Sequence, residues 1–115
     1  MSEPVIVVDY DPGWVTTFQE LHDRLKRSLG NMPHSIDHVG STSIPGAAAK
    51  PIIDIDVVLK SAADIPEAIE ALAKAGYHHL GDLGITGREA FESPSGPPLH
   101  HLYVVVLGAE NARAT

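Results

Sequence analysis

One run, residues 52–59 (IIDIDVVL), constrains the chain more than any other. It is rich in β-branched residues and contains neither proline nor glycine, which is typical of a buried β-strand. Side chains alternate across a strand, so Asp54 and Asp56 project from one face and the aliphatic side chains between them project from the other. The run therefore predicts a strand with one apolar face and one acidic face.

The acidic face has two interpretations. In the first, Asp54 and Asp56 are ordinary polar positions on the solvated face of an edge strand. In the second, they hold a divalent cation such as Mg²⁺, because two neighbouring carboxylates repel each other unless a positive charge lies between them. Aspartate is depleted in strands, and two of them in an Ile/Val run break the local pattern as functional sites do.

Residues that suit a phosphate group stand on both sides of this strand. Gly40 lets the main chain approach a ligand closely, and the following Ser41-Thr42-Ser43 offers hydroxyl and backbone N–H groups to an anion. Lys50, just before the strand, either attracts a phosphate or is a solvated loop lysine. Arg88 either clamps phosphate oxygens or pairs with a surface carboxylate.

The order of these motifs resembles the nucleotidyltransferase superfamily, in which a Gly-Ser pair after one strand is followed by Asp-x-Asp on the next. Gly40-Ser41 and Asp54-Ile55-Asp56 carry this signature. The longer blocks 38–46 (HVGSTSIPG) and 49–56 (AKPIIDID) are similar to one branch, the GrpB family. Further matches to that family are YDPGW at 10–14, GY at 76–77, GR at 87–88 with Phe91, and HHLYV at 100–104.

The fold expected from the resemblance and the periodicity is α/β in the α+β sense, with a small mixed sheet of the nucleotidyltransferase type. Apolar residues at helical spacing predict helices at 12–29 and 65–75, packed on one face of the sheet. Asp64 and Glu67 have the spacing of a capping box at the start of the second helix. The acidic strand is expected at the centre, and the other predicted strands are 5–8, 35–39, 77–80, 88–91 and 100–107.

Nucleotidyltransferases usually carry a third carboxylate on a later strand of the same sheet. The corresponding strand here opens with His100-His101 and contains no acid. One of the two histidines is expected to replace that carboxylate as a metal ligand or general base, because a neutral imidazole binds metals and titrates near neutrality. Alternation places only one of them on the aspartate face. We predict His101, because that choice keeps Tyr103 and Val105 in phase with it.

Composition sets the outer limits. At 115 residues, the chain is expected to form one domain spanning 1–115, and the absence of cysteine excludes disulfides and thiolate chemistry. A net charge of −7 argues against broad contact with nucleic acid but allows a small anionic ligand. The N-terminal stretch lacks a basic region and a long apolar run, so we expect a cytoplasmic protein without a membrane span.

The end of the chain also differs from what the resemblance implies. GrpB proteins typically continue past the last strand into a helical C-terminal segment, whereas this sequence stops at Thr115. The chain is therefore expected to lack that segment, as a fragment or a truncated form. An apolar sheet face left open in this way would be covered by a second copy, which predicts a homodimer.

The leading functional hypothesis is a nucleotidyltransferase that binds a nucleoside triphosphate with Mg²⁺ or Mn²⁺ and transfers a nucleotidyl group to an unknown acceptor. Asp54 and Asp56, with His101, would hold the metal and carry the catalysis. The phosphates would lie against the loop residues Gly40, Ser41 and Thr42, and Lys50 or Arg88 would neutralise their charge.

Two other hypotheses belong to different classes. GrpB-like domains resemble those joined to dephospho-CoA kinase in some bacteria, which implies a non-catalytic nucleotide-binding or regulatory module near coenzyme A metabolism. The third is a metal-dependent phosphohydrolase whose site combines His38, Asp54, Asp56 and His101. Release of phosphate or pyrophosphate with water as the sole acceptor would distinguish it from a transferase.

Overall fold

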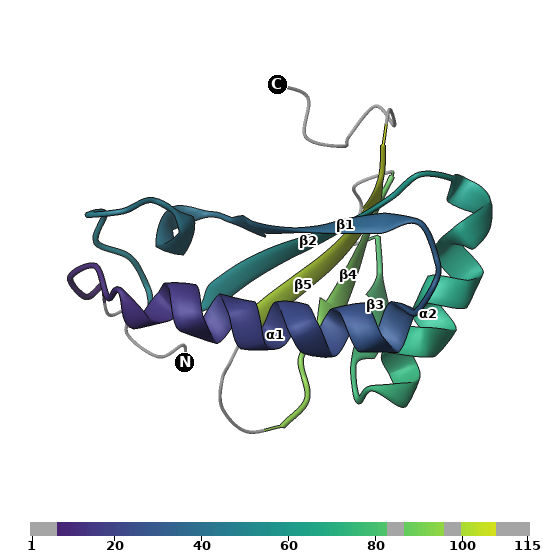
Figure 1. The fold of residues 1–115 in the computed structure, drawn as a ribbon, viewed down its shortest axis with the longest axis horizontal. Coiled ribbons are helices and arrows are strands. Elements are labelled where there is room, and N and C mark those ends of the chain that lie inside the picture. The colour runs from purple at the N-terminus through teal and green to yellow at the C-terminus, as the bar shows by residue number, and fades with distance from the viewer. Residues whose placement is uncertain (1–6, 83–86, 96–99, 108–115) are drawn as a thin grey trace.

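A single mixed β-sheet forms the frame of the molecule (Figure 1). The computed structural model describes residues 7–82, 87–95 and 100–107. Five strands are hydrogen-bonded in the order β1-β2-β5-β4-β3. Their bounds are β1 His34–Val39, β2 Ile53–Leu59, β3 His78–Gly81, β4 Arg88–Glu92 and β5 His100–Val106. Among the described strands, β2 and β5 pair in parallel and the other neighbours are antiparallel.

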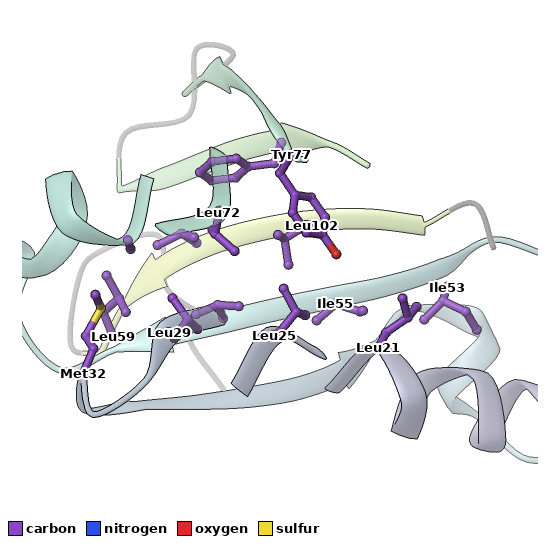
Figure 2. Close-up of a cluster of buried hydrophobic side chains, with 14 of the residues drawn as sticks. Leu21, Leu25, Leu29, Met32, Ile53, Ile55, Leu59, Leu72, Tyr77 and Leu102 are labelled. Carbon is purple, nitrogen blue, oxygen red and sulfur yellow. The ribbon is translucent and has the colours of Figure 1, made fainter. Parts of the chain in front are cut away.

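Two α-helices cover one face of this sheet, α1 (Gly13–Leu29) and α2 (Ile65–Lys74). Leucines spaced along α1 and Leu72 of α2 pack on the aliphatic side chains of β2 and β5 (Figure 2). The cluster includes Leu21, Leu25, Leu29, Leu72, Ile53, Ile55, Leu59 and Leu102. In the described ranges no α-helix lies on the opposite face, which we call the open face. The predicted α+β class, with both helices on one face, is confirmed.

Three details differ from the sequence-based expectations. The acidic strand β2 is interior, but β5 occupies the middle of the sheet because it pairs with both β2 and β4. Asp64 makes no side-chain cap to α2. The helix is instead preceded by a short 3₁₀ turn, η2 (Ala62–Asp64), where the Ser61 hydroxyl accepts a hydrogen bond from the N–H of Ala63 at 3.2 Å.

Parts of the expected layout fall outside the described residues. Of the predicted strand 5–8, Val8 forms a two-way backbone bridge with Ala49, and residues 5 and 6 are not described. Residues 83–86, 96–99 and 108–115 also lie outside the described ranges. Within those ranges, no helix combines the length and apolar character needed to cross a membrane.

Candidate functional site

Strict alternation along β2 separates the core from the site. Ile53, Ile55 and Val57 are buried against the helices, and Asp54 and Asp56 are half-buried on the open face. The pairing register places Asp54 beside His101 on β5. Residues paired in this way share a face of the sheet, so the open face carries the acidic pair of β2 next to a histidine of β5.

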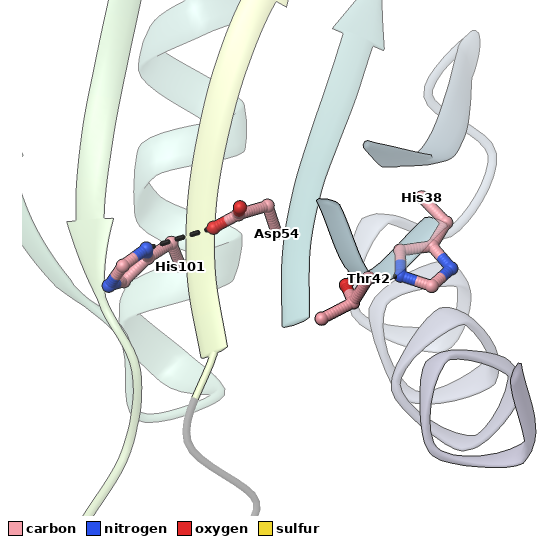
Figure 3. Close-up of polar contacts among 4 residues, drawn as sticks. All are labelled: His38, Thr42, Asp54 and His101. Carbon is pink, nitrogen blue, oxygen red and sulfur yellow. Dashed lines mark hydrogen bonds and ion pairs between the residues drawn. The ribbon is translucent and has the colours of Figure 1, made fainter. Parts of the chain in front are cut away.

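His101 is hydrogen-bonded to Asp54 (Figure 3). Nδ1 of the imidazole lies 2.9 Å from Oδ1 of the carboxylate. An ionised carboxylate only accepts, so Nδ1 carries the proton, and Nε2 of the neutral ring keeps a lone pair. His100 faces the helices, where its Nε2 lies 2.6 Å from the Tyr77 hydroxyl. His101 therefore shares the face of Asp54, as expected, and its role as ligand or base stays a prediction.

Gly40 makes room for the Asp54 carboxylate. It follows β1 with φ +77° and ψ −172°, a combination open to glycine and strained for other residues. A Cβ atom built at this position would collide with Oδ2 of Asp54. The glycine of the Gly-Ser pair is thus required by the aspartate on the neighbouring strand, in addition to any ligand that the loop binds.

The segment after Gly40 folds into a short 3₁₀ turn, η1 (Ser41–Ser43). The Ser43 hydroxyl donates to the Gly40 carbonyl at 2.6 Å, which ties the turn to its first residue. Thr42 is buried, with 2% of its surface exposed, and its Oγ1 lies 2.8 Å from Nε2 of His38. Ser41 in between stays exposed. The hydrogen bonds of Ser43 and Thr42 therefore hold the turn in place, and Ser41 remains on the surface.

His38 supports this turn from the helix-facing side of β1. Its ring stacks on Phe18 of α1, with 4.8 Å between ring centroids and an interplanar angle of 14°. Burial lowers the pKa of His38 below 6.5, and the charge of Asp54 opposes that shift. In the register, His38 pairs with the buried Ile55, so it does not share the face of Asp54 and Asp56. His38 therefore stands on the other face of the sheet from Asp54 and Asp56, and the phosphohydrolase hypothesis stays a prediction.

One small pocket collects most of the predicted ligand-binding residues. Its volume is about 140 Å³, and we call it the polar pocket. Its walls are Ser41, Thr42, Ala49, Lys50, Ile52, Asp54 and His101. The segment carrying Lys50 is held by the backbone bridge between Val8 and Ala49. Residues from two loops and two strands, distant in sequence, thus meet around a space that bears one cation and one carboxylate.

Asp56 and Arg88 lie further along the open face, outside the walls of the polar pocket. Asp56 is paired with Tyr103, and the Arg88 guanidinium lies over the Tyr103 ring, 4.3 Å from its centroid. Nε of Arg88 is buried without a hydrogen-bond partner. Among the described residues, no three His, Asp or Glu side chains are grouped closely enough to hold a metal ion. The predicted set of Asp54, Asp56 and His101 is not gathered around one point.

Two acidic residues beside the site were missed by the sequence analysis. Asp37 of β1 pairs with Asp56, and Glu92 of β4 pairs with His101. Alternation along β1 puts Asp37 on the face opposite His38, but only the antiparallel register shows that it stands beside Asp56. Nothing in the local pattern around Glu92 indicates which strand β4 joins. The open face is therefore more acidic than the two aspartates of β2 suggest.

Comparison with known proteins identifies the family. The family model described as "GrpB protein" matches residues 4–115. The chain belongs to the GrpB family. The crystal structure of the conserved protein GrpB from Enterococcus faecalis is similar, with a TM-score of 0.79 and 32% identity over 90% of this chain and 62% of that one.

Curated relatives carry several names. "UPF0157 protein YqkA" from Bacillus subtilis is 36% identical over 104 residues, covering 90% of this chain and 30% of its own length. A "Dephospho-CoA kinase" from Mycolicibacterium paratuberculosis is 42% identical over 80 residues, 67% of this chain and 20% of its own. The "Glutamate-rich protein GrpB" from Alkalihalophilus pseudofirmus is 39% identical over 76% of this chain and 51% of its own. The chain thus spans between a fifth and about half of these relatives.

Replacing Gly40 tests the contact between this loop and Asp54. Gly40→Ala is expected to lower the free energy of unfolding by roughly 2–4 kcal/mol, because backbone strain and the collision with Asp54 add together. Gly46→Ala is the matched control, since Gly46 has φ +84° but nothing within 4 Å of an added Cβ. Urea unfolding of both variants measures the difference, and equal losses would contradict the proposed steric role.

The environment of His38 predicts a pH dependence of stability. Its folded-state pKa lies below 6.5, so the unfolded chain binds more protons as the pH falls below that value, and the free energy of unfolding decreases. His38→Gln removes this titration. Urea unfolding at pH 7.5 and 5.5 should therefore show a smaller loss for the variant than for the wild type. Equal losses of the free energy of unfolding in the variant and the wild type would show that His38 does not contribute to the pH dependence.

Proposed function

We propose that this chain is a nucleotidyltransferase-like domain that binds a nucleoside triphosphate with a divalent cation and transfers a nucleotidyl group to an acceptor hydroxyl or amine. The observation that carries the proposal is the polar pocket, where Lys50, the Ser41 loop and Asp54 line one small space. A cation and hydroxyl groups suit phosphate oxygens, and a carboxylate beside them suits the metal that accompanies a triphosphate. The resemblance of these motifs to the nucleotidyltransferase signature points to the same chemistry.

Two walls of the polar pocket, Lys50 and Ser41, would contact a bound phosphate, and Thr42 would support the loop. Lys50 supplies a positive charge that neutralises phosphate oxygens, and the exposed Ser41 supplies a hydroxyl donor. Thr42 is hydrogen-bonded to His38 and only 2% exposed, so it holds the shape of the loop. Arg88, over the Tyr103 ring, adds a second cation on the same face of the sheet.

The donor chemistry of the open face fits Mg²⁺ or Mn²⁺. Asp54 and Asp56 would hold the ion, because two carboxylates with water and phosphate oxygens form the ligand set that such hard ions take. The bound ion would stabilise negative charge that develops on the reacting phosphate. The hydrogen bond from His101 fixes the orientation of Asp54, as the outer partners of metal-binding carboxylates do.

His101 also has the properties of a general base. Its Nδ1–H is committed to Asp54, and this fixes the tautomer in which Nε2 accepts a proton. Its side chain is 55% exposed, so an acceptor can reach it from solvent. Nε2 would take the proton of the acceptor hydroxyl or amine as that group attacks the phosphorus.

A second candidate function is favoured by the comparisons. Several of the matching relatives are named dephospho-CoA kinase, and the matched part is about a fifth of their length. A domain carried beside such an enzyme would bind nucleotide as a regulatory module without turning it over. Both functions use the polar pocket to bind the nucleotide. They differ only in whether the nucleotidyl group is then transferred to an acceptor.

Calorimetric titration with Mg-ATP and the other nucleoside triphosphates tests the site. Asp54→Asn and Asp56→Asn are each expected to weaken metal-dependent binding at least tenfold, because each removes a charged ligand of the cation. Asp23→Asn, on the exposed surface of α1, is the matched control and should bind as the wild type does. A wild-type affinity in the Asp54→Asn, Asp56→Asn double variant would refute the metal assignment.

Turnover separates the two candidates. Release of pyrophosphate, with the nucleotidyl group joined to an added hydroxyl or amine acceptor, supports the transferase. Tight binding that yields no product with a broad panel of acceptors supports the regulatory module.

A further inference from the structure

A second pocket adjoins the polar pocket on the open face. Its volume is about 380 Å³, and it lies over β3, β4 and the start of β5. We call it the apolar pocket. Its walls on the open face include Leu80, Ala90, Glu92 and Tyr103, and Phe91, Ser93 and His100 complete it at the edge of the sheet where β4 ends and β5 begins. Ile52 and His101 line both pockets, so the two spaces meet at these side chains.

The sizes of the two pockets indicate different contents. Sites for whole small molecules usually enclose roughly 300–1,000 Å³. The polar pocket, at about 140 Å³, is below that range and suits a phosphate group alone. The apolar pocket, at about 380 Å³, lies within the range and suits the organic part of a ligand. A phosphorylated molecule that bridges His101 would occupy both.

The walls of the two pockets also differ in polarity, and the larger pocket is the more apolar one. Leu80 is 44% exposed and contributes an aliphatic surface, and Ala90 and the Tyr103 ring continue that surface across the neighbouring strands. The one acidic side chain among the open-face walls, Glu92, repels phosphate oxygens. Lys50 in the polar pocket attracts them. Asp54 shares the polar pocket with Lys50, and the Arg88 guanidinium lies over the Tyr103 ring of the apolar pocket, so charge alone does not set the orientation of a ligand. The aliphatic surface around Leu80 favours the orientation in which the uncharged part lies there and the phosphates lie toward Lys50.

We propose that the apolar pocket is the subsite for the base and sugar of the nucleotide whose phosphates lie in the polar pocket, with His101 at the junction. This inference rests on the proposed function. It assigns to Leu80, Ala90 and Tyr103 a role in binding an uncharged ring by apolar contact, the usual composition of small-molecule sites. It also explains why a large aliphatic side chain is exposed on β3.

The experiment compares two probes by calorimetry in the presence of Mg²⁺, ATP and inorganic triphosphate. Only ATP has a part that reaches the apolar pocket. Wild-type protein should therefore bind ATP at least tenfold more tightly than inorganic triphosphate. Leu80→Ala should weaken ATP binding roughly fivefold to tenfold and leave inorganic triphosphate unchanged, because it removes apolar surface from this pocket alone.

Val15→Ala is the matched control, because Val15 is also a 44% exposed aliphatic residue but lies on α1, away from both pockets. It should not alter the affinity for either probe. Both substitutions are at exposed positions, so the variants are expected to fold, and circular dichroism of each checks this.

Two results would overturn the proposal and can be told apart. If inorganic triphosphate binds as tightly as ATP, or Leu80→Ala has no effect on ATP, the subsite is refuted and the phosphate site stands. If neither probe binds, the proposed function fails and the subsite fails with it.

Discussion

The two-faced character of β2 is the constraint on which the rest of the structure depends. Its odd-numbered residues enter the core beneath α1, and its even-numbered aspartates stand on the open face. A slip of one residue would place both carboxylates among leucines and the isoleucines in water, so the burial of Ile53, Ile55 and Val57 fixes the register of the sheet. The same packing that stabilises the fold therefore determines where the candidate site stands.

Much of this arrangement follows from the sequence. Alternation in 52–59 predicts the strand and the side on which Asp54 and Asp56 lie, and helical spacing predicts α1 and α2 to within one or two residues. These are local patterns, set by the geometry of one element. Phase along the last strand likewise places His101, rather than His100, on the face of Asp54.

What the sequence does not predict depends on which strands are neighbours. The parallel pairing of β2 with β5 puts His101 beside Asp54, and the antiparallel pairings bring Asp37 and Glu92 to the same face. No local pattern carries that information. The separation of His38 from the site follows from the β1 register, and the steric need for Gly40 is visible only where Asp54 approaches it.

Three side-chain contacts hold the candidate site in place. Gly40 and Asp54 are complementary in shape, His101 orients the carboxylate, and His38 holds Thr42 from the helix side. Around this framework the open face changes from a small polar space beside Lys50 to a larger apolar one beside Leu80. That gradient is what a phosphorylated organic ligand requires, and it supports nucleotide binding whether or not a group is transferred.

The most direct test of the central claim is a crystal structure grown with Mn²⁺ and a non-hydrolysable ATP analogue, with data collected at the manganese absorption edge. We predict an anomalous peak between the Asp54 and Asp56 carboxylates, with the triphosphate beside Ser41 and Lys50. Nucleotide bound at another place, or manganese bound away from both aspartates, would contradict the account.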